Sequence, residues 1–250
     1  MTKKISIIIM MLFMIGVLYA RENTPFINAA RRGDLNEVKK LVNQGQNINQ
    51  LGFNGYTALM YAASNGHTAV VEFLLQKRAD VTVRSDIWKN ALTLASRGGH
   101  VEVVRLLLKA GADPNQYEMG NRSALLYACF SGKVEIVQAL LDKNADINVT
   151  DENGVPPLLV ASARGPLNIV ELLVKRGAKV NLRNKTGMTP IIGAAANNQI
   201  AIVKLLIARG ADVNAKITGG QFAGKSALSF ALQRNLTEMI TILKNAGARE

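Results

Sequence analysis

The chain has 250 residues, of which 48% are hydrophobic and 19% are charged. This composition supports a large buried core and excludes an intrinsically disordered chain. The formal net charge of +12 favours partners with acidic surfaces. A single cysteine, Cys129, excludes an internal disulfide framework and a cysteine-based metal cluster, so packing must stabilise the fold.

Residues 1–20 have the order of a secretory signal peptide. Lys3 and Lys4 precede an apolar run over residues 5–18, and Ala20 closes the segment. We therefore expect export of a bacterial type, with cleavage after Ala20 and a mature chain of residues 21–250 in the periplasm or outside the cell. Leu18 is larger than the small residue preferred near a cleavage site, so an uncleaved membrane anchor is the alternative.

The rest of the chain repeats with a step of 33 residues. Three columns follow this step without exception: Ala29, Ala62, Ala95, Ala128, Ala161 and Ala194; Val38, Val71, Val104, Val137, Val170 and Val203; Leu41, Leu74, Leu107, Leu140, Leu173 and Leu206. After four extra residues, a seventh copy places Ala231, Ile240 and Leu243 in these columns. Such self-similarity indicates a solenoid of stacked repeats.

Each repeat predicts two helices. The first begins after a small polar residue that can cap its free amides, at Thr24, Thr57, Asn90, Ser123, Thr189 and Ser226. Pro156 and Pro157 interrupt this column, so we expect an irregular start there. The helix ends at residues suited to a positive φ, which are Gly33, Gly66, Gly99, Gly132, Gly165, Asn198 and Asn235.

The second helix carries a single apolar stripe, as Val101, Val104, Leu107 and Leu108 illustrate. A glycine ends this helix in most repeats, and a short polar connector follows. One such unit cannot cover its own stripe, so neighbouring repeats must stack.

This pattern resembles the ankyrin repeat, through TALMYAA, GHVEVVRLLLKAGADPN and IVKLLIARGADVN. The resemblance spans residues 24 to about 248 and implies an all-α solenoid of about seven repeats, at about 24–52, 53–85, 86–118, 119–151, 152–184, 185–217 and 218–250. It also implies a non-enzymatic module for protein–protein interaction. The family's histidine is missing from every first helix, which puts the family's usual hydrogen bonds between neighbouring first turns in question but not the fold.

Three features mimic chemical sites. Residues 219–226, GGQFAGKS, fit a phosphate-binding loop, but such a loop needs a preceding strand, and here the stretch contains the four-residue insertion of a connector. His67 and His100 occupy equivalent positions one repeat apart, which favours a structural role over metal binding or catalysis. Cys129 stands in a column of small packed residues. We therefore expect no enzyme, cofactor, metal or small-molecule substrate.

The resemblance implies a concave binding face formed by connector tips and the ends of first helices. Its candidate residues here are Phe53, Tyr56, Trp88, Lys89, Arg97, Arg122 and Phe130. Trp88 stands out because four other repeats have a glycine in its column, at Gly55, Gly154, Gly187 and Gly224. Our hypothesis is that the aromatic residues anchor a partner while the basic residues contact its acidic groups. The alternative is local packing of the aromatic rings and solvated charges.

The leading prediction is therefore an exported, monomeric ankyrin-repeat protein that binds another protein with an acidic surface. A membrane-tethered structural or adaptor protein of the envelope, and a secreted effector acting on host proteins, are the alternatives. The Lys and Arg residues are dispersed among the repeats, which argues against a nucleic-acid partner.

Overall fold

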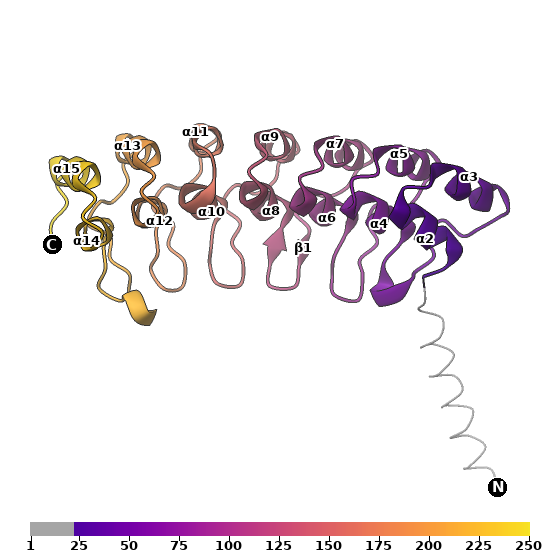
Figure 1. Ribbon diagram of the computed structural model, residues 1–250, viewed down its shortest axis with the longest axis horizontal. Helices are drawn as coiled ribbons and strands as arrows, with labels where there is room; N and C mark the ends of the chain where they lie inside the picture. Colours follow the sequence, from indigo (N-terminus) through magenta and orange to yellow (C-terminus); the bar gives the residue numbers. More distant parts are fainter. Residues whose placement is uncertain (1–22) are drawn as a thin grey trace, which may run out of the picture.

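The 33-residue period produces a single row of helical pairs (Figure 1). The computed structural model describes residues 23–250, so the predicted signal peptide at 1–20 lies outside the described residues. The first helices of the seven pairs are α2 (Pro25–Arg32), α4 (Ala58–Ser64), α6 (Ala91–Gly98), α8 (Ala124–Ser131), α10 (Pro157–Arg164), α12 (Pro190–Ala196) and α14 (Ala227–Gln233). The second helices are α3 (Leu35–Asn43), α5 (Thr68–Gln76), α7 (Val101–Lys109), α9 (Val134–Asp142), α11 (Leu167–Lys175), α13 (Ile200–Ala208) and α15 (Thr237–Asn245).

First helices pack on first helices and second helices on second helices, so two layers run along the row. The alanine column is fully buried in every repeat, which lets neighbouring first helices approach closely. Leu74, Leu107 and the later members of the leucine column are also fully buried. Leu41, in the first repeat, is only partly buried because a stacked neighbour covers it on one side alone. The predicted all-α solenoid is confirmed.

The predicted caps precede the first helices. Five of the six polar side chains accept the expected backbone hydrogen bond, whereas the buried hydroxyl of Thr189 has no partner among the described residues. The fifth first helix starts with Pro157 at its first turn and with Pro156 in the extended conformation of a cap residue. The start of α10 thus lacks only the side-chain cap.

The expectation of a positive φ after each first helix is wrong at one position. Gly165 has φ −83° and ψ 163°, while the other six residues of that column are left-handed. The reason is Pro166, because a proline ring disfavours helical backbone at the preceding residue and favours extended backbone.

The connectors project from the first-helix side of the row and carry the few strands and 3-10 turns (Figure 1). Strand β1 (Tyr117–Glu118) pairs antiparallel with β2 (Arg122–Ser123) in one connector. The turns η1 (Phe53–Gly55) and η2 (Gly220–Phe222) lie in two others. The stretch at 219–226 is thus a longer connector with a turn, as the repeat columns predict.

Hydrogen bonds between repeats run through the connectors and the two histidines. Five connector asparagines accept a backbone N–H from the next repeat, at 2.8–2.9 Å; they are Asn49, Asn115, Asn148, Asn181 and Asn214. The Nε2 atoms of His67 and His100 each lie 3.0 Å from a carbonyl oxygen of the preceding repeat, at Arg31 and Ser64. The structural interpretation of both histidines is therefore confirmed.

Within residues 23–250, no helix combines the length and apolar character needed to cross a membrane.

Candidate functional site

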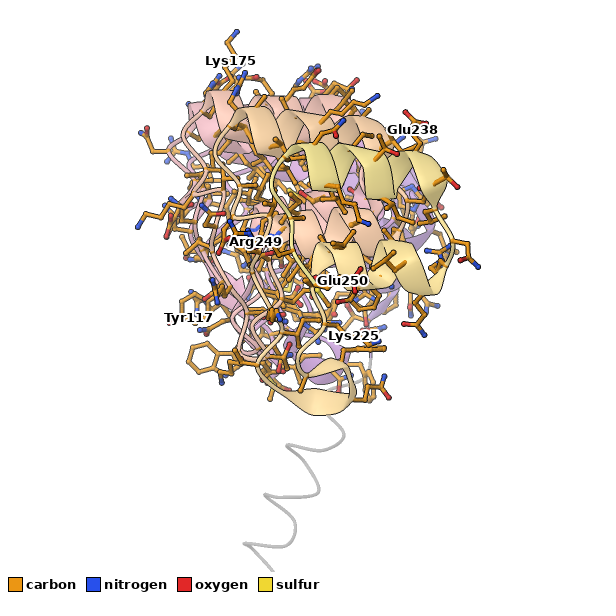
Figure 2. The ribbon with its side chains drawn as sticks, turned by 90° about the vertical axis from the view of Figure 1, so that its left-hand side faces the viewer. Tyr117, Lys175, Lys225, Glu238, Arg249 and Glu250 are labelled. Carbon is orange, nitrogen blue, oxygen red and sulfur yellow. The ribbon has the colours of Figure 1, made fainter. Side chains whose placement is uncertain are left out.

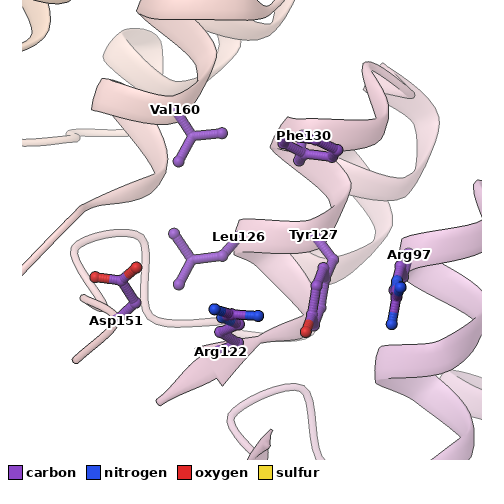
Figure 3. A pocket seen from close by; sticks show the side chains of 7 residues that line it. All are labelled: Arg97, Arg122, Leu126, Tyr127, Phe130, Asp151 and Val160. Atoms are coloured by element: carbon purple, nitrogen blue, oxygen red, sulfur yellow. The ribbon is translucent and has the colours of Figure 1, made fainter. Parts of the chain in front are cut away.

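A hollow of about 450 Å³ opens between the first helices and the connectors in the middle of the row (Figure 3). Arg97 enters it from the end of α6, and Val160 enters from α10 on the other side. We call it the central hollow; its lining residues are Arg97, Arg122, Leu126, Tyr127, Phe130, Asp151 and Val160.

Helix α8 supplies the apolar wall of the central hollow. Phe130 follows Leu126 by four residues and Tyr127 by three, so both lie next to it on the helix surface, and all three line the hollow. Leu126 is buried, whereas Phe130 is 60% exposed and has the Arg164 guanidinium 5.6 Å from its ring centre. The wall therefore offers an uncovered aromatic surface beside positive charge.

A buried acidic side chain fixes the polar end of this wall. The column of Glu118 holds Ser85 one repeat earlier and Asp151 one repeat later. The side chains of these two residues accept backbone N–H hydrogen bonds within their own connectors. Glu118 has a longer side chain, and its Oε2 instead accepts a hydrogen bond of 2.8 Å from the Tyr127 hydroxyl. Burial, followed by the Glu118 carboxylate, raises the pKa of Tyr127, and the Arg122 charge opposes this shift. Tyr127 is therefore a neutral, fixed donor rather than a titrating group.

A second hollow of about 330 Å³ lies next along the row, and Arg97 lines both. Tyr56, Lys89 and Leu94 are among its other lining residues. We call the two hollows together the basic groove. Lys89, Arg97 and Arg122 form no ion pair within the part of the chain that the structure describes; the ion pairs there involve other residues. The groove thus presents three positive charges that form no ion pair there, and the carboxyl group of Asp151 lies beside them in the central hollow.

The structure divides the seven candidate residues into two groups. Tyr56, Lys89, Arg97, Arg122 and Phe130 line the basic groove. Phe53 and Trp88 do not line it; they lie at connector tips and are 56% and 52% exposed.

Local contacts involve several of the aromatic candidates. The Trp88 ring has the Arg84 guanidinium 5.3 Å from its centre, and Tyr56 packs on Tyr61 with ring centres 5.0 Å apart. Local packing, the alternative to partner binding, therefore accounts for part of the Tyr56 surface. It leaves half of Trp88 uncovered.

Four lining residues of the central hollow were not among the candidates, namely Leu126, Tyr127, Asp151 and Val160. The signal for Tyr127 is its column, which varies in size and polarity through Asn28, Tyr61, Leu94, Tyr127, Val160, Gly193 and Phe230. The variation of this column marks it as a place to look for binding residues, although Leu94 and Phe230 in it are buried core residues.

Groups that could support catalysis are not gathered here. Across residues 23–250, no group of three or more His, Cys, Asp or Glu residues could hold a metal ion. Cys129 is fully buried, and burial raises the pKa of its thiol well above the usual range. The groove is therefore equipped for binding through charge and apolar surface.

Comparison with known proteins identifies the family. The sequence model of ankyrin repeats, in three copies, matches residues 6–85, 82–151, 125–217 and 158–249. The chain belongs to the ankyrin-repeat family. Ankyrin repeats generally mediate protein–protein interaction, and the fold is generally a non-enzymatic binding module.

Relatives and solved structures agree with this assignment. Human ankyrin repeat domain-containing protein 39 is 48% identical over 52 residues, which are 21% of this chain and 28% of that protein. The human NAD-capped RNA hydrolase NUDT12 is 39% identical over 61 residues, 24% of this chain and 13% of that enzyme. The crystal structure of the human ASB11 ankyrin repeat domain has a TM-score of 0.78 at 28% identity and covers 89% of this chain and 97% of its own. The matched segments thus span less than a third of these two curated relatives.

Proposed function

We propose that the protein is an exported binding module that holds an acidic protein partner in the basic groove. The observation that carries this proposal is the position of Arg97, which lines both hollows of the groove without an ion pair among the described residues. A partner side chain with a carboxylate can pair with Arg97 from either hollow.

The apolar wall makes the expected partner more specific. Phe130, Leu126 and Val160 lie in the same hollow as Arg97 and Arg122. A partner segment that has an apolar side chain next to an acidic one can contact both the apolar wall and the two arginines. Because the hydrogen bond from Tyr127 to Glu118 and the stacked repeats fix the wall, binding requires little ordering of the protein. A monomer is sufficient for this mode of binding, and no small-molecule substrate is needed.

Export is the second part of the proposal and rests on the sequence of residues 1–20. It places the protein in the periplasm or outside the cell. Sequencing the amino terminus of the protein purified from its native compartment tests this part. Arg21 as the first residue supports cleavage, whereas an intact Met1 in a membrane fraction supports the tethered alternative. A partner from a host cell would support the alternative of a secreted effector.

Site-specific photo-crosslinking tests the groove. A photoreactive phenylalanine replaces Phe130 in one variant and Lys175 in a second variant; Lys175 lies on the side opposite the connectors (Figure 2). We expect a partner that cross-links at position 130 and not at 175, and mass spectrometry should map the adduct to an acidic segment. Equal cross-linking at both positions, or an adduct on a basic segment, would reject the groove as the binding site.

A further inference from the structure

The tips of the first three connectors form an exposed apolar edge that the groove does not use. Eight large hydrophobic side chains are exposed in the described part of the chain, and six of them lie here. We call this set the hairpin edge; it consists of Leu51, Phe53, Ile87, Trp88, Tyr117 and Met119, which are 39–64% exposed. Figure 2 shows Tyr117 on the connector side of the row, away from the helices. A cluster of exposed apolar side chains on the surface of a protein indicates an interaction site.

The hairpin edge is also where the connectors depart from their regular pattern. Neighbouring tips elsewhere are joined by a backbone hydrogen bond, as Glu152 N–H to the Gly120 carbonyl illustrates. The equivalent bond between the tips at Ile87 and Met119 is missing from the bonds of the described residues. In its place Arg84 lies between two rings, 5.3 Å from the centre of Trp88 and 5.9 Å from that of Tyr117. These tips are held by side chains that stay open to solvent.

Trp88 keeps a backbone conformation that its side chain disfavours. Its φ is 63°, in the left-handed region that glycine occupies in four other repeats. A bulky residue in this region is strained, and such strain persists where it serves a function. Apart from its contact with Arg84, the ring covers no core residue, and its exposed half is available to a surface outside the protein.

We propose that the hairpin edge docks on an anionic membrane surface. Tryptophan and tyrosine favour the boundary between lipid headgroups and acyl chains, where an apolar ring and a polar edge are both satisfied. Phe53, Leu51 and Met119 add apolar surface beside them. Arg84 can extend its guanidinium to a lipid phosphate while its stem stays in the apolar layer. The net charge of +12 attracts the whole molecule to an anionic leaflet.

The direction in which the chain enters the fold agrees with this orientation. Asn23, the first described residue, accepts a hydrogen bond of 3.1 Å from the Phe53 N–H and donates one of 3.2 Å to the Tyr61 hydroxyl. The chain therefore enters the repeats beside the first connector tip. The apolar run over residues 5–18 precedes this point.

The net charge favours a lipid surface over a second copy of the chain. Two copies docked edge to edge would bring two molecules of charge +12 together, and like charges repel. A protein partner at the edge is the remaining competitor, and the experiment separates it from lipid. The inference goes beyond the proposed function because the edge and the basic groove share no residue.

The experiment uses Trp88, the single tryptophan of the chain, as the probe. Full-length protein is mixed with vesicles of phosphatidylcholine and phosphatidylserine, or of phosphatidylcholine alone. We expect the Trp88 emission to shift to shorter wavelengths with the anionic vesicles only, and brominated acyl chains to quench it. Added salt should reverse both effects.

Two matched variants locate the contact. Phe53→Ser, at the edge, should reduce vesicle partitioning about tenfold because it removes an aromatic side chain from the lipid contact. Phe130→Ser, in the groove, removes a side chain of similar exposure and should leave partitioning unchanged. Circular dichroism should show that both variants keep the wild-type fold.

Three outcomes would overturn the proposal. Vesicle binding with unchanged Trp88 emission would show that residues before the repeats bind lipid while the edge stays in water. An equal shift with neutral and anionic vesicles would remove the role of charge. A shift caused by a purified protein partner, with none from vesicles, would assign the edge to protein binding.

Discussion

Trp88 allows the strain at the connector tip to be measured directly. Both Trp88→Gly and Trp88→Ala remove the ring and its contact with Arg84, so the loss of that contact cancels when the two variants are compared. Alanine keeps the Cβ atom, which costs about 1–2 kcal/mol in a left-handed conformation. Glycine avoids this cost but gives up about 0.5–1 kcal/mol through the greater freedom of the unfolded chain. The free energy of unfolding should therefore be larger for the glycine variant than for the alanine variant by about 0.75 kcal/mol, the difference between the midpoints of these two ranges.

Urea unfolding followed by circular dichroism measures this difference, because neither variant contains tryptophan. Lys89 provides the matched control, since it is the next residue and its φ is not positive. There alanine should be more stable than glycine by about 0.5–1 kcal/mol. If Trp88→Ala is as stable as Trp88→Gly, or more stable, the backbone at this position is not strained and the functional argument built on it fails.

Three further predictions concern the buried residues. Leu107→Ala should lower the free energy of unfolding by about 2–5 kcal/mol, measured in urea, because Leu107 is fully buried between repeats. Tyr127→Phe should cost about 1–3 kcal/mol by removing the donor to the buried Glu118, and Glu118→Leu in that background should recover part of the loss. Cys129 should react with a thiol reagent only after unfolding. Because burial raises the pKa of Cys129, the contribution of this thiol to stability is fully present below its unfolded pKa of about 8.5 and falls as the pH rises above that value. Urea unfolding at several pH values, with Cys129→Ala as the control, measures this loss.

The sequence columns predict the fold well because each repeat makes the same contacts with its neighbours. Alanine, valine and leucine at fixed positions determine which surfaces meet, and these contacts decide the stack. Gly165 shows the limit of this reasoning. Its column predicts a left-handed residue, but the next residue in the chain, Pro166, has the stronger effect on the backbone. The column of Gly165 carries no information about Pro166, so the two residues must be considered together.

The candidate site is only partly predictable for a different reason. The resemblance to ankyrin repeats assigns Arg97, Arg122 and Phe130 to the columns of a concave binding face, and the structure places them in one hollow. The orientation of Tyr127 depends on its hydrogen bond to Glu118, whose side chain is longer than the others in its column. Only the three-dimensional structure shows that this longer side chain reaches the Tyr127 hydroxyl. Likewise, Trp88 is conspicuous in its column, but its contact with Arg84 needs the geometry of the connector tip.

The dependence of partner affinity on salt and on groove charge tests the central claim most directly. The dissociation constant of the cross-linked partner is measured at increasing ionic strength for the wild type, Arg97→Glu and Lys175→Glu. Wild-type affinity should fall as salt rises, and Arg97→Glu should weaken binding about tenfold at low salt and flatten the salt dependence. Lys175→Glu, on the opposite side of the molecule, should resemble the wild type. Equal affinities for all three proteins, independent of salt, would contradict binding of an acidic partner in the basic groove.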